Sequence, residues 1–128
     1  MEESRIRAVE HVHIETSHGL DDDLRWFYGE VAGLEEKAQT DPESPVLCFK
    51  SARIELRLTS VDRPHIETET YRITLLVESL NEAIELLEER SVAYERLTGI
   101  GFTDRRVGTR DPAGNRIILK QHWPHAPL

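Results

Sequence analysis

The sequence predicts a single α+β domain made of two copies of one β-α-β-β-β unit. Three observations lead to this prediction: the length of 128 residues, a strand pattern followed by a helix pattern near the N-terminus, and the return of the same order in the second half. A chain of this length can bury one substantial core, and it is too short for two. We expect module one at about 8–60, a connector at 61–70, module two at about 71–122 and a tail at 123–128.

Module one opens with a strand at 11–16, because apolar Val12 and Ile14 alternate there with polar neighbours. A helix is predicted next, starting at the three aspartates 21–23, whose negative charge suits a helix N-terminus. This helix ends near Gly33. Its apolar stripe has helical spacing and consists of Leu24, Phe27, Tyr28 and Val31.

Two or three further strands are expected in module one. Two of them are predicted at 46–50 and 53–59, and the second of these alternates charged with apolar residues. Module two then repeats the opening order. Residues 72–77 alternate as a strand, and Ser79 and Glu82 have the spacing of a capping box that starts a second helix.

The last part of module two is predicted to be β structure. Short strands are expected between Arg96 and Arg110, broken by glycines. The run Asp111–Asn115 reads Asp-Pro-Ala-Gly-Asn, which favours a turn because proline presets φ and Gly-Asn tolerates positive φ. A final strand follows at 116–120.

The composition of the chain argues against several classes of function. The chain has 24 acidic and 16 basic residues and a formal charge of −8, which argues against a nucleic-acid partner. No apolar run is long enough to cross a membrane, and the N-terminus lacks the features of a secretory signal, so we expect a cytoplasmic protein. The single cysteine, Cys48, excludes an intrachain disulfide and a cysteine zinc cage. Neither a phosphate loop nor a nucleophile elbow occurs.

Four segments together resemble the vicinal oxygen chelate superfamily, which includes glyoxalase I, bleomycin resistance proteins and extradiol dioxygenases. These are His11–Ile14, Arg25–Tyr28 ahead of Gly33, Val77–Leu80, and Asp111–Ile117. The resemblance spans roughly residues 9–122. It implies a glyoxalase-like fold in which the curled mixed sheets of two βαβββ modules face each other around a cup, and it implies a homodimer.

The resemblance also implies where a divalent metal would bind, namely on the first and last strands of both modules. Matched to this sequence, the four positions are His11, Glu55, Arg72 and Ile118. The first two are competent ligands, whereas a permanently charged arginine and an isoleucine are not. We therefore expect an incomplete, degenerate metal site without a catalytic metal. The alternative is a divalent metal held by two histidines and one carboxylate, with His13 joining His11 and Glu55.

Strand alternation places more basic than acidic side chains on the faces that line the cup. The basic set is Arg53, Arg57, Arg72, Arg116 and Lys120, and the acidic set is Glu15 and Glu55. A concave site magnifies such an excess, so we predict a small anionic or carboxylate-bearing ligand. Its expected binding residues are Arg57 and Arg72, with His13, Arg53 and Lys120 contributing. Arginine–glutamate pairs with a purely structural role across strands are the alternative.

Two functions follow from these expectations. The preferred one is a small-molecule binding protein of the bleomycin-resistance type that needs no cofactor. The alternative is an enzyme, either a lyase, isomerase or dioxygenase with a divalent metal at His11 and Glu55, or an acid–base catalyst using the same pair. The positive charge of Arg72 would lower the pKa of Glu55 and make that carboxylate a poor base at neutral pH.

Overall fold

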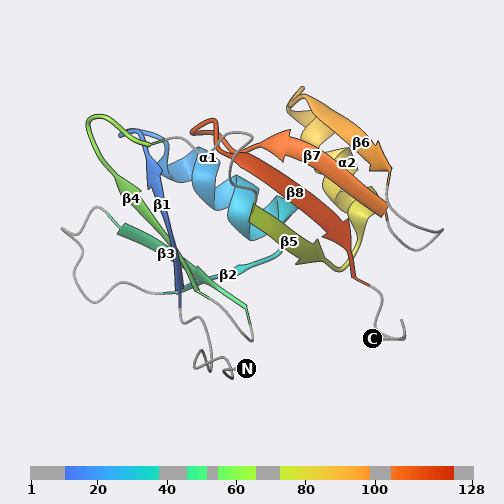
Figure 1. The fold of residues 1–128 in the computed structure, drawn as a ribbon, viewed down its shortest axis with the longest axis horizontal. Coiled ribbons are helices and arrows are strands. Elements are labelled where there is room, and N and C mark those ends of the chain that lie inside the picture. Colours follow the sequence, from blue (N-terminus) through green and yellow to red (C-terminus); the bar gives the residue numbers. More distant parts are fainter. Residues whose placement is uncertain (1–10, 38–45, 52–54, 66–72, 99–104, 123–128) are drawn as a thin grey trace, which may run out of the picture.

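The elements follow the order strand, helix, three strands, and then repeat it (Figure 1). The structure, a computed structural model, describes residues 11–37, 46–51, 55–65, 73–98 and 105–122. Module one contains β1 (His11–Thr16), α1 (Asp21–Arg25), η1 (Trp26–Val31), β2 (Glu35–Lys37), β3 (Val46–Lys50) and β4 (Glu55–Ser60). Module two contains β5 (Ile73–Val77), α2 (Leu80–Glu89), β6 (Tyr94–Thr98), β7 (Arg105–Arg110) and β8 (Arg116–Gln121). The predicted repeat is confirmed.

Each module forms one four-stranded mixed sheet. Sheet one has the order β1-β4-β3-β2, and sheet two has the equivalent order β5-β8-β7-β6. In both, the first strand runs parallel to the last, and the other pairs are antiparallel. Across the described ranges, no strand of one sheet pairs with a strand of the other. The predicted α+β class is therefore confirmed, with two sheets that stay open rather than closing into a barrel.

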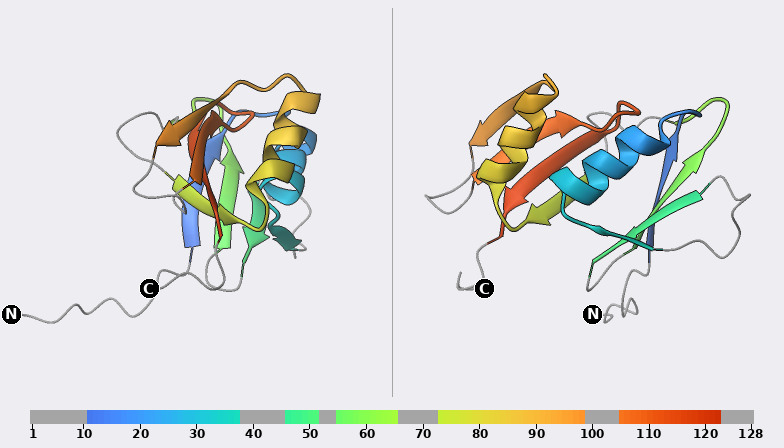
Figure 2. Two further views of the ribbon diagram at one scale, coloured as in Figure 1. Left: turned by 90° about the vertical axis from the view of Figure 1, so that its right-hand side faces the viewer. Right: turned by 180° about the vertical axis from the view of Figure 1, so that it is seen from behind.

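Both helices lie on the same side of the two sheets (Figure 2, left and right). Strand alternation therefore sends every second residue toward the helices, where those residues form one core with the apolar stripes of the helices. From the first and last strands this core takes Ile14, Leu56, Leu58, Leu75, Val77, Ile117 and Leu119. From the helices it takes the predicted stripe of module one together with Leu80, Ala83, Ile84 and Leu87. Among the residues that the structure describes, no helix covers the opposite faces of the two sheets, which are called here the helix-free faces.

Local chemistry sets where the helices begin and end. α1 continues without a break into the wider π-helical turn η1, where the Ala32 amide donates to the Phe27 carbonyl at 2.9 Å. The chain then leaves the helix at Gly33, whose φ of 78° favours glycine. α2 starts as predicted, with the Glu82 amide donating to Ser79 Oγ at 3.2 Å. Neither helix of the described ranges has the length and apolar character that crossing a membrane requires.

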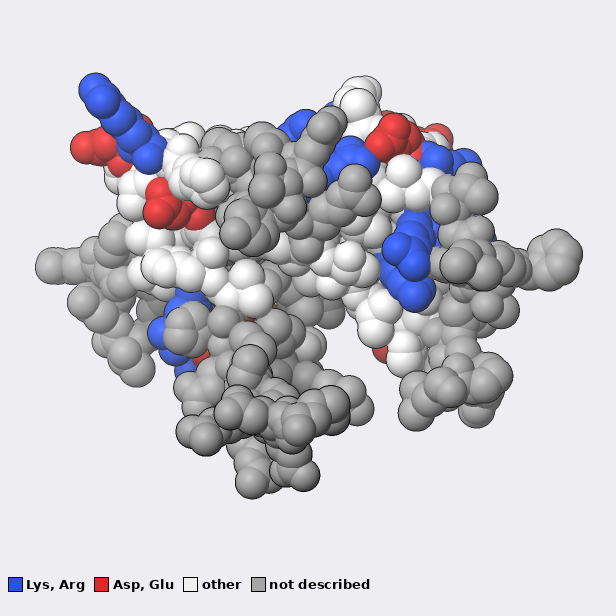
Figure 3. Space-filling model, viewed as in Figure 1, with Lys and Arg blue, Asp and Glu red and all other residues white. Residues whose placement is uncertain are grey.

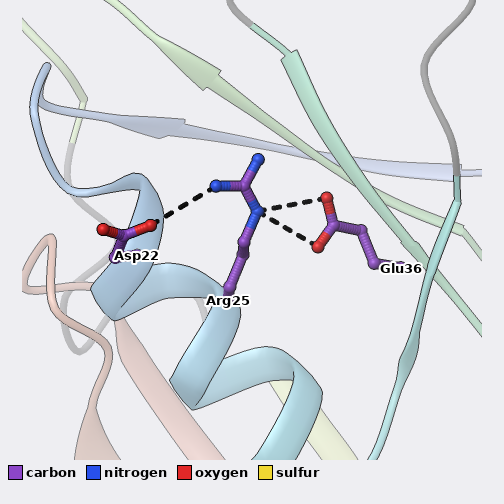
Figure 4. Close-up of polar contacts among 3 residues, drawn as sticks. All are labelled: Asp22, Arg25 and Glu36. Carbon is purple, nitrogen blue, oxygen red and sulfur yellow. Dashed lines mark hydrogen bonds and ion pairs between the residues drawn. The ribbon is translucent and has the colours of Figure 1, made fainter.

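An exposed arginine links the first helix to the edge strand of sheet one (Figure 4). Arg25 Nε donates to both carboxylate oxygens of Glu36 on β2, each at 3.2 Å. Its Nη1 lies 3.5 Å from Asp22 on the same helix. These contacts raise the pKa of Arg25, and the hydrogen bond that Arg25 donates to Glu36 is the largest cause. Arg25 thus connects the short strand β2 to the helix through exposed contacts.

A buried polar cluster joins the two modules at the predicted Asp111–Asn115 turn. Tyr28 Oη donates to Asp111 Oδ2 at 2.5 Å, and the Asn115 amide donates to Asp111 Oδ1 at 2.8 Å. Asn115 Nδ2 also donates to the carbonyl of Glu15 on β1, at 3.3 Å. Burial raises the pKa of Asp111 and of Tyr28, and the negative charge of Asp111 raises that of Tyr28 further. The turn of module two is therefore anchored to the helix and first strand of module one.

Candidate functional site

The helix-free faces of the two sheets point toward the viewer in Figure 3, which shows lysine and arginine side chains over both of them. On sheet one, the pairing register aligns Lys37, Cys48, Arg57 and His13 in a row across all four strands. Register partners point to the same face of a sheet. Glu55 stands on the same face of β4, two residues before Arg57.

The Glu55 carboxylate lies between two cations. Its Oε1 is 3.6 Å from Lys37 Nζ, and its Oε2 is 3.5 Å from Arg57 Nη2. The side chain of Glu55 is only 18% exposed, whereas those of Arg57 and Lys37 are 43% and 55% exposed. These three side chains therefore present the positive charges of Lys37 and Arg57 to solvent, with the Glu55 carboxylate beneath them.

The pKa values around Glu55 reflect this pairing. Desolvation alone would raise the pKa of Glu55, but the hydrogen bond from Arg57 and the positive charges of Lys37 and Arg57 lower it below its ordinary value. Desolvation and the neighbouring carboxylate raise the pKa of the Cys48 thiol. Glu55 is therefore an ionised, paired carboxylate and a poor proton acceptor at neutral pH.

The other predicted residues of module one are placed as follows. His13 is exposed, and its Nε2 is hydrogen-bonded to Thr59 Oγ1 on β4. His11 lies opposite Glu55 in the register, but its side chain is outside what the structure describes, as is all of Arg53. The backbone register thus places His11 beside Glu55 on neighbouring strands, and the metal role predicted for the two residues stays a prediction.

The register also relates the modules to each other. In module one Val12 pairs with Leu56, and in module two Ile73 pairs with Ile117. The residue that corresponds to Glu55 is therefore Arg116, the first residue of β8, whereas comparison with the family motif selected Ile118. Strand alternation had placed Arg116 among the basic residues of the cup but had not selected it as a binding residue or as the counterpart of Glu55. The signal that could have done so was the constant spacing of the repeat when Leu56 is matched with Ile117.

Arg116 lies flat across sheet two. A Cβ on Gly108 of β7 would come within 2.5 Å of Arg116 Nη2 and 2.8 Å of its Cζ, so only glycine leaves room for this guanidinium. Beyond Gly108, Arg116 Nη2 donates to Glu95 Oε1 on β6 at 2.5 Å. Here the arginine is 18% exposed and the glutamate 60% exposed.

The rest of the helix-free face of sheet two is mixed in character. Ile118 is buried although it is not part of the core cluster, which agrees with its place on this face. Lys120 is half-buried and pairs in register with Leu76 on one side and Arg106 on the other. Leu76 is 59% exposed. Arg72, the other predicted anchor, lies outside the described residues.

The residues at the four expected metal positions do not form a complete donor set. Glu55 has a carboxylate, but two cations already neutralise it. Neither Ile118 nor the register equivalent Arg116 can donate an electron pair to a metal. Among the residues with described side chains, no three of His, Cys, Asp and Glu gather closely enough to bind a metal ion. The described residues thus do not fit a four-ligand site.

Two pockets open where sheet two meets the α2–β6 connection. One of about 490 Å³ is lined by Arg116, Glu95, Gly108 and Arg110, together with residues 92–94. The other, of about 320 Å³, reaches toward the first helix and is lined by Trp26, Arg90 and Asp23 among others. Arg90 lies over the Trp26 ring, 4.2 Å from its centroid. Of the predicted ligand and metal contacts whose side chains the structure describes, none lines either pocket.

Known proteins resemble this chain in structure. No family model and no curated protein matches the sequence. A protein assigned to the glyoxalase family from Bacillus anthracis aligns with a TM-score of 0.76 at 20% identity, over 95% of this chain and all of its own length. Lactoylglutathione lyase from Agrobacterium tumefaciens aligns with a TM-score of 0.65 at 20% identity, and the alignment covers 92% of this chain and 96% of the lyase. TnmS3, an antibiotic binding protein from Streptomyces sp. CB03234, aligns with a TM-score of 0.66 at 25% identity, and the alignment covers 94% of this chain and all of TnmS3. The chain therefore has a glyoxalase-like fold.

Proposed function

We propose that this protein binds a small anionic molecule on the helix-free faces of its two sheets and does so without a metal cofactor. The observation that carries the proposal is the arrangement at Glu55, whose carboxylate lies beneath the more exposed Arg57 and Lys37. An incoming carboxylate or phosphate can accept hydrogen bonds from these two cations without displacing a deeply buried group. The similarity to an antibiotic binding protein supports small-molecule binding as the general role.

Arg57 is the main anchor in this proposal. It stands in the central part of sheet one, in register with Cys48 and His13, so a ligand over Arg57 also reaches the exposed His13. Arg53, Arg72 and Lys120 remain predicted contributors. The homodimeric state, the cytoplasmic location and the module boundaries expected from the sequence also remain predictions.

A thermal-shift screen tests the proposal. The full chain is heated with inorganic phosphate, with a panel of small carboxylates and with divalent metal ions, because a ligand that binds the folded state raises the melting temperature. We expect anions to stabilise the wild type, with the shift lost in Arg57→Ala and reduced in Lys37→Ala. Arg63→Ala removes an exposed arginine outside both sheets and is the matched control, since it should keep the shift. Anions that stabilise Arg57→Ala as strongly as the wild type contradict the proposal.

The alternative is a metal-dependent enzyme, favoured by the register that puts His11 opposite Glu55 and by the similarity to lactoylglutathione lyase. Elemental analysis of the purified protein separates the two. One tightly held transition metal per chain, lost in Glu55→Gln, would establish the alternative and overturn the proposed metal-free site.

A further inference from the structure

The larger pocket of sheet two has the features of a second ligand site. Its volume of about 490 Å³ lies within the usual range for small-molecule pockets. It is separate from the group around Arg57, which belongs to sheet one. It is also separate from Lys120, which lies four residues beyond Arg116 on β8, or about 13 Å along an extended strand.

The guanidinium of Arg116 forms the polar floor of this pocket. Its side chain is only 18% exposed and crosses the sheet directly over Gly108, where any Cβ would displace it. Its planar geometry suits two parallel hydrogen bonds to one carboxylate. Arg110, at the end of β7, also lines the pocket and donates to the carbonyl of Gly114 at 2.9 Å. The pocket therefore holds a fixed arginine with a second one at its rim.

The carboxylate of Glu95 already shows what this arginine binds. Arg116 Nη2 donates to Glu95 Oε1 at 2.5 Å, yet the Glu95 side chain is 60% exposed. Glu95 can consequently rotate into solvent at little cost, because exposed ion pairs contribute little free energy. Arg116 is enclosed by the sheet and cannot follow. Glu95 thus occupies the place of a ligand carboxylate.

Val92, Tyr94, Thr109 and Asp111 also line the pocket, and the pairing register places Tyr94 and Thr109 on the helix-covered face of sheet two, opposite to the face that carries Glu95 and Gly108. Val92 and Tyr94 are partly buried against the core. Tyr94 is held in place by its hydroxyl, which donates to Glu88 Oε1 at 2.7 Å.

We infer that this pocket binds a small carboxylate, that Arg116 is the anchor, and that Glu95 is an internal mimic which the ligand displaces. The inference concerns sheet two alone and does not depend on the function proposed for sheet one.

Amide chemical-shift titration of the full chain with benzoate tests this inference, with benzamide as the uncharged probe of the same shape. We expect benzoate, and not benzamide, to shift the amides of Ala93, Gly108 and Thr109 in a saturable way. Glu95→Gln removes the competing carboxylate and should tighten benzoate binding about fivefold, since more of the protein is then ready to bind. The matched control is Glu85→Gln on the exposed face of α2, which changes the net charge equally and should leave the affinity unchanged.

Two arginine variants separate this site from the first one. Arg116→Lys keeps the charge but loses the planar pair of donors, and we expect benzoate to bind about tenfold more weakly. Arg57→Ala should leave the shifts around Gly108 unchanged, whatever its effect on anions at sheet one. The inference is overturned if benzoate fails to saturate these shifts in both the wild type and Glu95→Gln, if benzamide acts equally, or if Glu85→Gln tightens binding as much as Glu95→Gln.

Discussion

The first residue of the last strand carries opposite charge in the two modules. In module one it is Glu55, 18% exposed beneath the more exposed Arg57 and Lys37. In module two it is Arg116, also 18% exposed, and its more exposed partner is Glu95. The backbone register is the same, but the sign of the enclosed charge is reversed. Sheet one therefore presents cations outward, whereas sheet two encloses a cation behind a replaceable carboxylate.

This comparison has a physical lesson. The enclosed member of an ion pair is fixed by packing, and the exposed member is free to exchange its partner with solvent or ligand. Two modules with one fold can thus bind anions in different ways: by the exposed cations in sheet one, and by displacement of the exposed carboxylate in sheet two.

The largest loss in the free energy of unfolding is expected from a substitution in the Asp111 cluster, where the two modules are joined. Asp111→Ala removes the acceptor of Tyr28 Oη and of the Asn115 amide, so two buried donors lose their partner. We expect a loss of about 3 kcal/mol in the free energy of unfolding, measured by urea denaturation. Asp22→Ala, at a fully exposed carboxylate of α1, is the control and should stay near zero. Equal losses in both variants would mean that the cluster does not hold the modules together.

The next largest loss of stability is expected from a substitution in sheet two, within module two. Gly108→Ala forces Arg116 off the sheet, because the new Cβ would come within 2.5 Å of Nη2. We expect a loss of about 1–2 kcal/mol from this overpacking. Gly29→Ala is the matched control, since its Cβ would meet only Phe49 at 4.0 Å. A neutral Gly108→Ala, with the Arg116–Glu95 bond intact in its crystal structure, would contradict this account of sheet two.

In module one, the pairing of Glu55 predicts how the stability of the protein depends on pH in the acidic range. Because the pKa of Glu55 is lower in the folded protein than in the unfolded chain, its ionised form favours the folded state above the ordinary glutamate pKa. That contribution should disappear as the pH falls through the lowered value. In Glu55→Gln the melting temperature should depend less on pH over this acidic window, as measured by calorimetry. A pH dependence that is the same in Glu55→Gln as in the wild type would contradict this role of the Glu55 carboxylate.

The smallest effect is expected at the edge of sheet one. Arg25→Ala removes the exposed contacts to Glu36 and Asp22, and such pairs contribute only about 0.5 kcal/mol. The change should be measurable by urea denaturation and should shrink in high salt. Arg63→Ala serves as the reference for removal of an arginine charge. A loss several times larger would show that β2 depends on this arginine for its place in the sheet.

Much of the fold could be predicted because its signals are local. Alternation at 11–16 and 72–77, helical spacing from Leu24 to Val31, and the chemistry of the Asp111–Asn115 turn each depend on neighbours in the chain. The wider turn of η1 was not predicted, since a π-helical segment presents nearly the same apolar stripe as an α-helix.

The site was predicted less completely. Strand alternation correctly assigned Arg57 and Glu55 to one face and explained why they meet. It could not identify Lys37, whose approach to Glu55 depends on the position of the edge strand β2. It also ranked Arg116 as one basic residue among several, because the space over Gly108 arises from strands that are distant in sequence.

The sequence by itself determined the repeated order of elements and which face of each strand and helix is buried, because backbone geometry imposes these periods within a few residues. Only the tertiary structure decided which residues of the two modules correspond, how the Asp111 cluster joins them, and which member of each ion pair is enclosed. These features depend on strand register and on packing between distant segments, which local patterns do not specify.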